Sequence, residues 1–167
     1  IIYLWPGIVL RSPKKGKIMK FTPEEKAVLR QADEIISRKI VGTDYITSPD
    51  AVRALLRYRL AAEQREIFCV LHLDNQNGVI AFEEVFHGTV NSVGVHPRVV
   101  LQQAMHHNSK NLILVHNHPS AKMEPSQADK HITKKIVNLM NVVEVDVIDH
   151  MIVCGDKIYS FAEHGLI

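Results

Sequence analysis

Residues 111–119 read Asn-Leu-Ile-Leu-Val-His-Asn-His-Pro, and this stretch decides the fold. The run from Asn111 to His116 is short and almost wholly apolar, which is typical of a strand buried in the centre of a sheet. Pro119 ends the strand pairing because proline has no backbone N–H to donate. The sequence therefore predicts a central strand over 111–116 that leads directly into a polar loop.

Strand-like and helix-like patterns follow one another on both sides of this strand. Further strands are expected at 67–73, 79–86, 142–148, 151–154 and 157–161. The first two form a hairpin, because the turn between them is rich in residues that tolerate positive φ. Helices are expected after Pro97 and after the N-cap residue Ser126. This order predicts one mixed α/β domain, with a central mixed β-sheet flanked by helices.

An N-terminal helical appendage precedes the sheet. Thr22-Pro23-Glu24-Glu25 predicts a helix start with Thr as the N-cap and Glu three residues later. Gly42 is expected to stop this helix, and Ser48-Pro49-Asp50 to start a second one. We therefore divide the chain into a tail, a helical segment and an α/β domain, with bounds 1–20, 21–45 and 46–167.

The composition is that of an ordinary globular protein. The chain has 167 residues, of which 46% are apolar and 23% charged, which argues against wholesale disorder. Its two cysteines lie in apolar runs and are too few for a cysteine-based zinc site. Such cysteines favour a reducing compartment, so we expect a cytoplasmic protein. No stretch is long and apolar enough to predict a membrane span.

The positive charge is concentrated at one end. Residues 1–20 hold five Lys or Arg and no acidic residue, so the remaining 147 residues hold 15 basic and 18 acidic ones, a net −3. We expect this basic tail to lie outside the fold, either disordered or introduced by cloning. By composition, the body of the protein is not a strong nucleic-acid binder.

Three side chains near the central strand have the types and spacing of a metal site. His116 and His118 are two residues apart on a strand exit and so point to the same face. Asp129 falls in the first turn of the next helix, a short loop away. Two imidazoles and a carboxylate suit a catalytic Zn²⁺, which keeps a fourth position for water. Taken singly, Asp129 could be a favourable charge at a helix N-terminus and His116 a hydrogen-bonded core residue.

The sequence lacks the motifs of three other metal-dependent enzyme classes. An HNH nuclease spreads its His, Asn and His over a ββα unit, whereas here the three letters are consecutive. A zinc deaminase needs H-x-E and P-C-x-x-C, and a zincin needs H-E-x-x-H on a helix. The chain contains no C-x-x-C and no H-E-x-x-H.

The residues do resemble one known signature. His116-Asn117-His118-Pro119-Ser120 followed by Pro125-Ser126-Gln127-Ala128-Asp129 resembles the JAMM (MPN+) metalloprotease signature, in its RadC branch. Further RadC-like blocks occur in order over about residues 46–167. These blocks are Arg65-Glu66, Leu73-Asp74, Glu84-Val85-Phe86, Gly88-Thr89, His96-Pro97-Arg98, Asp149-His150 and residues 160–165.

The chain departs from the RadC pattern in three ways. Residues 21–60 are too short for the helix-hairpin-helix region of longer RadC proteins, so the chain resembles the short, prophage-type homologues. Ala121 stands where RadC relatives usually have Gly, a change that removes no proposed ligand. The basic tail has no counterpart in the family.

The resemblance implies a catalytic base and an oxyanion donor beside the metal. Glu66 matches the family Glu that takes a proton from the zinc-bound water, although from spacing alone Glu83 and Glu84 are rivals. Ser126 matches the family Ser that donates a hydrogen bond to the developing oxyanion. Ser126 is also a good helix N-cap, and that structural role alone would explain it.

A single JAMM/MPN-like domain with one Zn²⁺ ion is therefore expected. The implied function is a zinc-dependent metallohydrolase, a peptidase or isopeptidase with a peptide or protein substrate. The alternative is a DNA-repair-associated or nucleic-acid-associated RadC-like accessory module with little or no protease activity. A basic patch for that purpose would comprise Arg53, Arg57, Arg59 and Arg65.

Overall fold

The computed structural model of the chain describes residues 21–40, 49–60, 63–88, 94–120 and 122–167. The expectations for the basic tail, for the helix stop at Gly42, for the cap at Ser48 and for the loop residue Ala121 lie outside these residues.

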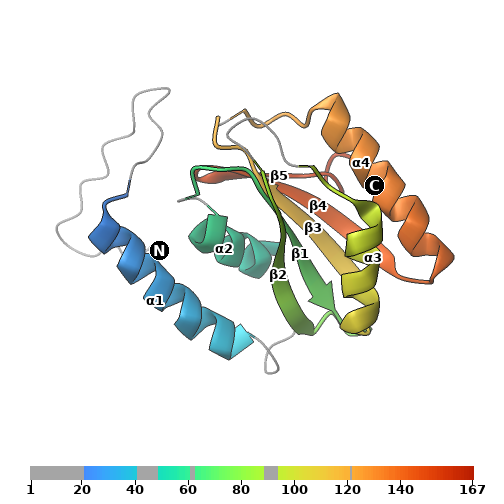
Figure 1. Cartoon of the computed structure of the whole chain (residues 1–167), viewed down its shortest axis with the longest axis horizontal. Coiled ribbons are helices and arrows are strands. Elements are labelled where there is room, and N and C mark those ends of the chain that lie inside the picture. The colour runs from blue at the N-terminus through green and yellow to red at the C-terminus, as the bar shows by residue number, and fades with distance from the viewer. Residues whose placement is uncertain (1–20, 41–48, 61–62, 89–93, 121) are drawn as a thin grey trace, which may run out of the picture.

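A five-stranded mixed sheet forms the centre of the domain, with the strand order β2-β1-β3-β4-β5 (Figure 1). Its strands are β1 (Ile67–Leu73), β2 (Val79–His87), β3 (Asn111–Asn117), β4 (Asp146–Cys154) and β5 (Lys157–Ser160). β1 pairs antiparallel with β2 and β3, β3 pairs parallel with β4, and β4 pairs antiparallel with β5. The predicted hairpin and the predicted central strand are therefore confirmed.

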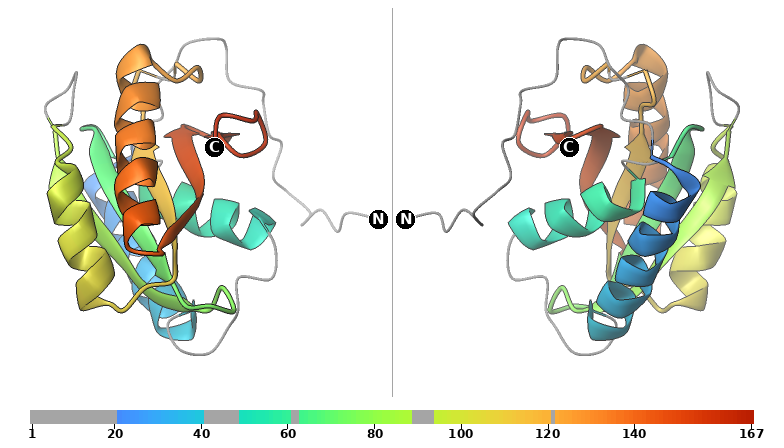
Figure 2. Two further views of the ribbon diagram at one scale, coloured as in Figure 1. Left: turned by 90° about the vertical axis from the view of Figure 1, so that its right-hand side faces the viewer. Right: turned by 90° about the vertical axis from the view of Figure 1, so that its left-hand side faces the viewer.

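Helices cover both faces of this sheet. They are α1 (Pro23–Ile40), α2 (Pro49–Leu60), α3 (Pro97–His106) and α4 (Gln127–Val142). α2 lies on one face and carries α1 on its outer side, whereas α3 and α4 lie together on the other face (Figures 1 and 2). The expected mixed α/β architecture is confirmed.

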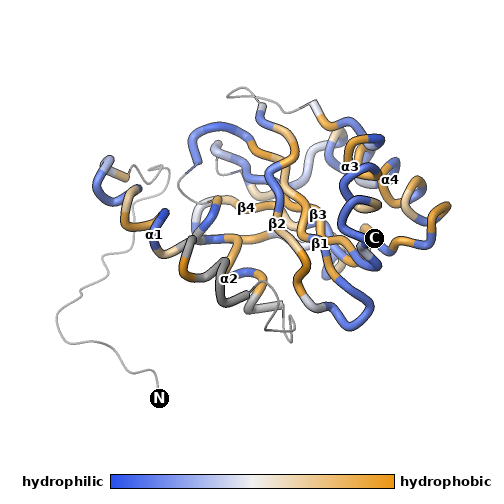
Figure 3. Tube along the Cα trace, turned by 60° about the horizontal axis from the view of Figure 1, so that its bottom comes forward, coloured by the Kyte–Doolittle hydropathy of each residue, from blue (hydrophilic) through white to orange (hydrophobic). Residues whose placement is uncertain are grey.

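The two-residue period of β3 sorts its side chains between two cores. Ile113 and Val115 pack with the α2 side, while Leu112 and Leu114 pack with the side covered by α3 and α4. The strands are the most continuously apolar part of the chain in Figure 3. Because the alternation continues, His116 falls on the α3/α4 face.

One prediction about the strands is wrong. Residues 142–148 and 151–154 were expected to form two strands, but α4 continues to Val142 and a single strand spans Asp146–Cys154. The helix ends at Val142 with Val143 as its C-cap, and the following residue, Glu144, takes a positive φ of 59°. The polar pair Asp149-His150 stays inside the ladder, because the Asp149 carboxylate accepts hydrogen bonds from the backbone N–H of His150 and from the Ser160 hydroxyl.

The first helix begins as predicted. Thr22 Oγ1 accepts from the backbone N–H of Glu25, whose carboxylate in turn accepts from the backbone N–H of Thr22. Val28 and Ile35 of this helix are exposed, at 64% and 51%, so these apolar positions do not contribute to the core. Within the described residues, no helix has the length and apolar character that crossing a membrane requires.

Candidate metal centre

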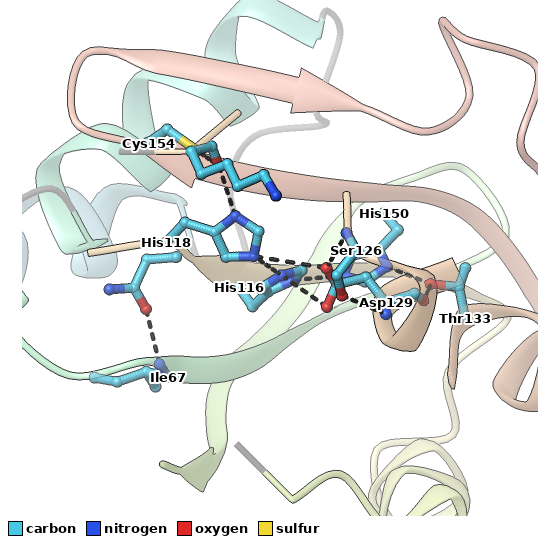
Figure 4. A network of polar contacts seen from close by, with 10 residues as sticks. Ile67, His116, His118, Ser126, Asp129, Thr133, His150 and Cys154 are labelled. Atoms are coloured by element: carbon cyan, nitrogen blue, oxygen red, sulfur yellow. Dashed lines mark hydrogen bonds and ion pairs between the residues drawn. The ribbon is translucent and has the colours of Figure 1, made fainter. Parts of the chain in front are cut away.

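Four potential ligands converge where β3 leaves the sheet. Glu66, His116, His118 and Asp129 each offer one ligand atom, and these atoms all lie within 4.8 Å of one another. Glu66 immediately precedes β1. His116 lies at the end of β3, His118 in the following loop and Asp129 in the first turn of α4 (Figure 4). The structure thus brings together the three predicted metal ligands and the predicted base.

The spacing of the donor atoms matches a tetrahedral zinc site. Nε2 of His116 is 3.0 Å from Nε2 of His118 and 3.4 Å from Oδ1 of Asp129, and Nε2 of His118 is 3.6 Å from Oδ2 of Asp129. Neighbouring donors around a tetrahedral Zn²⁺ with bonds of about 2.0–2.1 Å are about 3.3 Å apart. The three side chains therefore fit this ion without rearrangement of the backbone.

A hydrogen-bond chain fixes the tautomer of His116. The Thr133 hydroxyl donates to the backbone carbonyl of Asp129 at 2.6 Å, so its oxygen accepts from Nδ1 of His150, also at 2.6 Å. Neutral His150 then has its lone pair on Nε2 and accepts from Nδ1 of His116 at 2.8 Å. The remaining nitrogen of His116, Nε2, therefore points a lone pair into the cluster.

His118 is oriented in the same way. Its Nδ1 lies 2.7 Å from the backbone carbonyl of Lys122, which can only accept, so this nitrogen carries the proton. Neutral His118 would thus present a second lone pair on Nε2, which lies 3.0 Å from Nε2 of His116. Two facing lone pairs beside a carboxylate repel unless a proton or a metal cation lies between them, and this donor chemistry fits a cation.

Without a metal, a proton takes this place. Hydrogen bonds to Asp129 and Cys154 raise the pKa of His118 to about 10, whereas burial lowers the pKa of His116 to about 4. Burial opposes ionisation of Asp129, but hydrogen bonds to His118 and Ser126 and the nearby His116 outweigh it and lower the carboxyl pKa. The metal-free site therefore contains an anionic Asp129 and a cationic His118.

Ser126 and Asp129 form the N-terminal cap of α4. Ser126 Oγ accepts from the backbone N–H of Asp129 at 3.1 Å, and Oδ2 of Asp129 accepts from the backbone N–H of Ser126 at 2.7 Å. This capping box fixes the carboxylate and leaves Oδ1 directed at His116. The structural role predicted for Ser126 is therefore present, and its hydroxyl also lines the cleft beside the ligands.

Asn117 holds the segment that carries Glu66. Its Oδ1 accepts from the backbone N–H of Ile67 at 2.8 Å, and its Nδ2 donates to the backbone carbonyl of Arg65 at 2.9 Å. The buried Asn117 side chain thus forms hydrogen bonds with the backbone on both sides of Glu66. Burial raises the pKa of the Glu66 carboxyl, which makes it a stronger base than a solvated glutamate. The rivals Glu83 and Glu84 are not part of this group.

The ligands lie in a cleft of about 510 Å³. Phe68, Val95 and Ile132 supply apolar surface, and Lys122 and Glu124 lie at its polar side. An open, partly apolar cleft beside a metal site has room for a substrate and for water.

Sequence reasoning missed three residues that support the ligands: Asn117, Thr133 and His150. They follow no spacing rule, since each acts through a contact between different elements. The only available signal was that His150 and Asn117 fall inside RadC-like blocks.

Comparison with known proteins shows which family this chain resembles. Residues 46–166 match the family model of the RadC-like JAB domain. The chain is 47% identical over 150 residues to the UPF0758 protein YkfG of Escherichia coli, covering 89% of this chain and 94% of that protein. For the UPF0758 protein YeeS of the same organism the identity is 43% over 148 residues, with 87% and 99% covered. The UPF0758 protein Tgr7_0100 of Thioalkalivibrio sulfidiphilus is 44% identical over 142 residues, which is 85% of this chain and 63% of that longer protein.

The chain therefore belongs to the RadC-like JAB domain family. The resemblance inferred from the two motifs is confirmed, as is the single mixed α/β domain. Membership supports a metallohydrolase type of fold, while the printed names of the relatives specify no reaction.

Proposed function

We propose that this protein is a zinc-dependent metallohydrolase that cleaves peptide or isopeptide bonds. The observation that carries this proposal is that Nε2 of two histidines, an Asp129 carboxylate oxygen and Glu66 lie within 4.8 Å of one another, at the wall of an open cleft. Two His and one Asp would hold the ion, which leaves Glu66 as the group available for proton transfer.

A bound Zn²⁺ would acidify a water molecule and polarise a substrate carbonyl. Glu66 would then accept a proton on its carboxylate and return it to the leaving amine. Its raised pKa suits this role, because a proton must be held briefly and then released near neutral pH. The Ser126 hydroxyl would donate a hydrogen bond to the developing oxyanion.

The residues that line the cleft support a peptide or protein substrate. The apolar side chains at Phe68, Val95 and Ile132 would contact substrate side chains, and the polar side at Lys122 and Glu124 would contact its backbone or charged groups. This mixture suits a peptide or protein segment. Both cysteines of the chain are free and buried, in keeping with the cytoplasmic location we propose.

Two substitutions test the division of roles. His118→Ala removes a ligand and should lose the zinc ion of this site and hydrolysis together. Glu66→Gln keeps the shape of the side chain and every proposed ligand, so it should retain zinc while hydrolysis falls by about 10²–10⁴-fold. The measurements are zinc content and cleavage of a peptide and isopeptide panel. Full activity of Glu66→Gln would refute its assignment as the base.

The nucleic-acid alternative rests on the arginines of the predicted basic patch. Arg53 forms an ion pair with Glu163, and the Arg59 guanidinium lies 4.4 Å from the centre of the Phe82 ring. These intramolecular contacts favour the hydrolase. A zinc-loaded protein that cleaves nothing on the panel and binds nucleic acid with a steep salt dependence would favour the accessory module instead.

A further inference from the structure

A second cluster of potential ligands lies at the opposite end of β1. His72 on β1, Glu83 on β2 and His107 at the C-cap of α3 place one ligand atom each within 4.8 Å of the others. His72 pairs with Leu112, whereas His116 of the first site pairs with Phe68. Four residues of strand, about 13 Å, therefore separate the two sites along β1. Figure 1 shows the arrowhead of β1 beside the end of α3.

This cluster contains buried polar atoms that have no partner. Among the described residues, three buried side-chain nitrogen or oxygen atoms make no hydrogen bond, and all three belong to this cluster. They are Nε2 of His72, Oε2 of Glu83 and Nε2 of His107. Buried polar groups are nearly always satisfied, so three orphan atoms that face one another indicate a missing common partner.

The three residues do not satisfy one another by hydrogen bonds. The His72 side chain is completely buried, and its Nε2 lies 3.8 Å from Oε2 of Glu83, too far for a hydrogen bond. Nε2 of His107 lies 3.0 Å from Oε1 of Glu83 without the alignment of a hydrogen bond. The two imidazole rings are 4.5 Å apart between centroids. The three orphan atoms therefore lie close together, and none of them has a hydrogen-bond partner.

The surroundings orient these donors. Nδ1 of His72 is 2.9 Å from the Ser109 hydroxyl, which can accept a hydrogen bond from it, and the tautomer that makes this bond has its lone pair on Nε2. The two measured separations, 3.0 and 3.8 Å, lie on either side of the roughly 3.3 Å between donors around a tetrahedral Zn²⁺. Glu83 and His107 are only partly buried, at 32% and 18% side-chain exposure, so the cluster lies near the protein surface.

We propose that His72, Glu83 and His107 form a second binding site for a divalent transition-metal ion, Zn²⁺ by its donor chemistry. The ion satisfies all three orphan atoms at once and joins the end of α3 to β1 and β2. Because it lies outside the cleft that contains Glu66, its role is to hold α3 against the sheet.

Counting metal ions in matched variants tests this site. The full chain, dialysed against Zn²⁺, should contain two ions, and His118→Ala should contain one. Glu83→Gln keeps the size of the side chain and removes its charge, so it should lose the second ion and also contain one. Glu84→Gln is the matched control, since Glu84 is the next residue on the same strand and is exposed; it should keep both ions.

A thermal measurement separates this proposal from the hydrolase. Added Zn²⁺ should raise the unfolding temperature of the His118→Ala variant, because its second site is intact. The same addition should not change the unfolding temperature of the His118→Ala/Glu83→Gln double variant. A wild-type chain with one ion, lost in His118→Ala and kept in Glu83→Gln, would overturn the second site and leave the first intact. One ion lost only in Glu83→Gln would support the second site and overturn the first.

Discussion

At the scale of single residues, the metal centre depends on hydrogen bonds that set where each proton lies. Thr133 and His150 together place a lone pair on Nε2 of His116, and the Lys122 carbonyl does the same for His118. These partners come from α4, β4 and the loop after β3. A ligand's identity is thus a property of the sequence, whereas its tautomer is a property of the neighbours that surround it.

Asn117 offers a test of positioning at this scale. Asn117→Ala should leave the backbone N–H of Ile67 without its buried partner and destabilise the protein by about 1–3 kcal/mol. Hydrolysis should fall while zinc content is unchanged, because Glu66 is displaced and every ligand remains. Denaturant unfolding and zinc analysis provide the measurements. Loss of zinc in this variant would contradict the separation of the two roles.

At the scale of elements, the start of α4 combines a structural and a chemical task. The capping box ties Asp129 to Ser126, so the same contacts that begin the helix also aim a ligand. The strand end of β3 aims the two imidazoles. The site therefore exists because the end of the central strand β3, the loop after it and a capped helix meet at one end of the sheet.

Ser126→Ala separates the two roles of the cap. Loss of the cap should cost about 1 kcal/mol of stability. If Ser126 also donates to the oxyanion, hydrolysis should fall by about 10²-fold or more at temperatures where the variant is folded. Thr22→Ala is the control, because it removes the cap of α1, and it should reduce stability without changing hydrolysis. Equal hydrolysis by both variants would reduce Ser126 to a helix cap.

At the scale of the whole molecule, zinc binding should be coupled to pH. The metal-free protein has a proton on His118, whose pKa is raised from 6.5 to about 10. This raised pKa stabilises the metal-free fold fully below pH 6.5, and the contribution is lost as the pH rises towards 10. Zinc must displace the proton, so its affinity should increase as the pH rises through the same range.

The increase in unfolding temperature caused by zinc should therefore be larger at about pH 8.5 than at about pH 6.5. Calorimetric titration in buffers of different ionisation enthalpy should also detect about one proton released per ion at the first site. His118→Ala should lack this released proton. A zinc affinity that does not change with pH in the wild-type chain would contradict the assignment of a cationic His118 to the metal-free site.

The sequence by itself determined the central strand, the hairpin, the capped helix starts and the types and spacing of the ligands. These features are local: an apolar run, a turn with its preferred residues, and a cap followed three residues later by its partner. The single β4 strand was not predictable in this way, because Asp149 and His150 resemble a turn until Ser160 and His116 supply their partners.

Only the tertiary structure decided which distant groups meet. The hydrogen bonds of Asn117 to the backbone around Glu66 hold that residue beside the two metal-site histidines. Packing also brings together His72, Glu83 and His107 from two strands and the end of a helix. Nothing in the sequence distinguishes His72 or His107 from the other scattered histidines. The physical reason is that the direction of a side chain and the burial of its last polar atom depend on packing between elements, which no local pattern encodes.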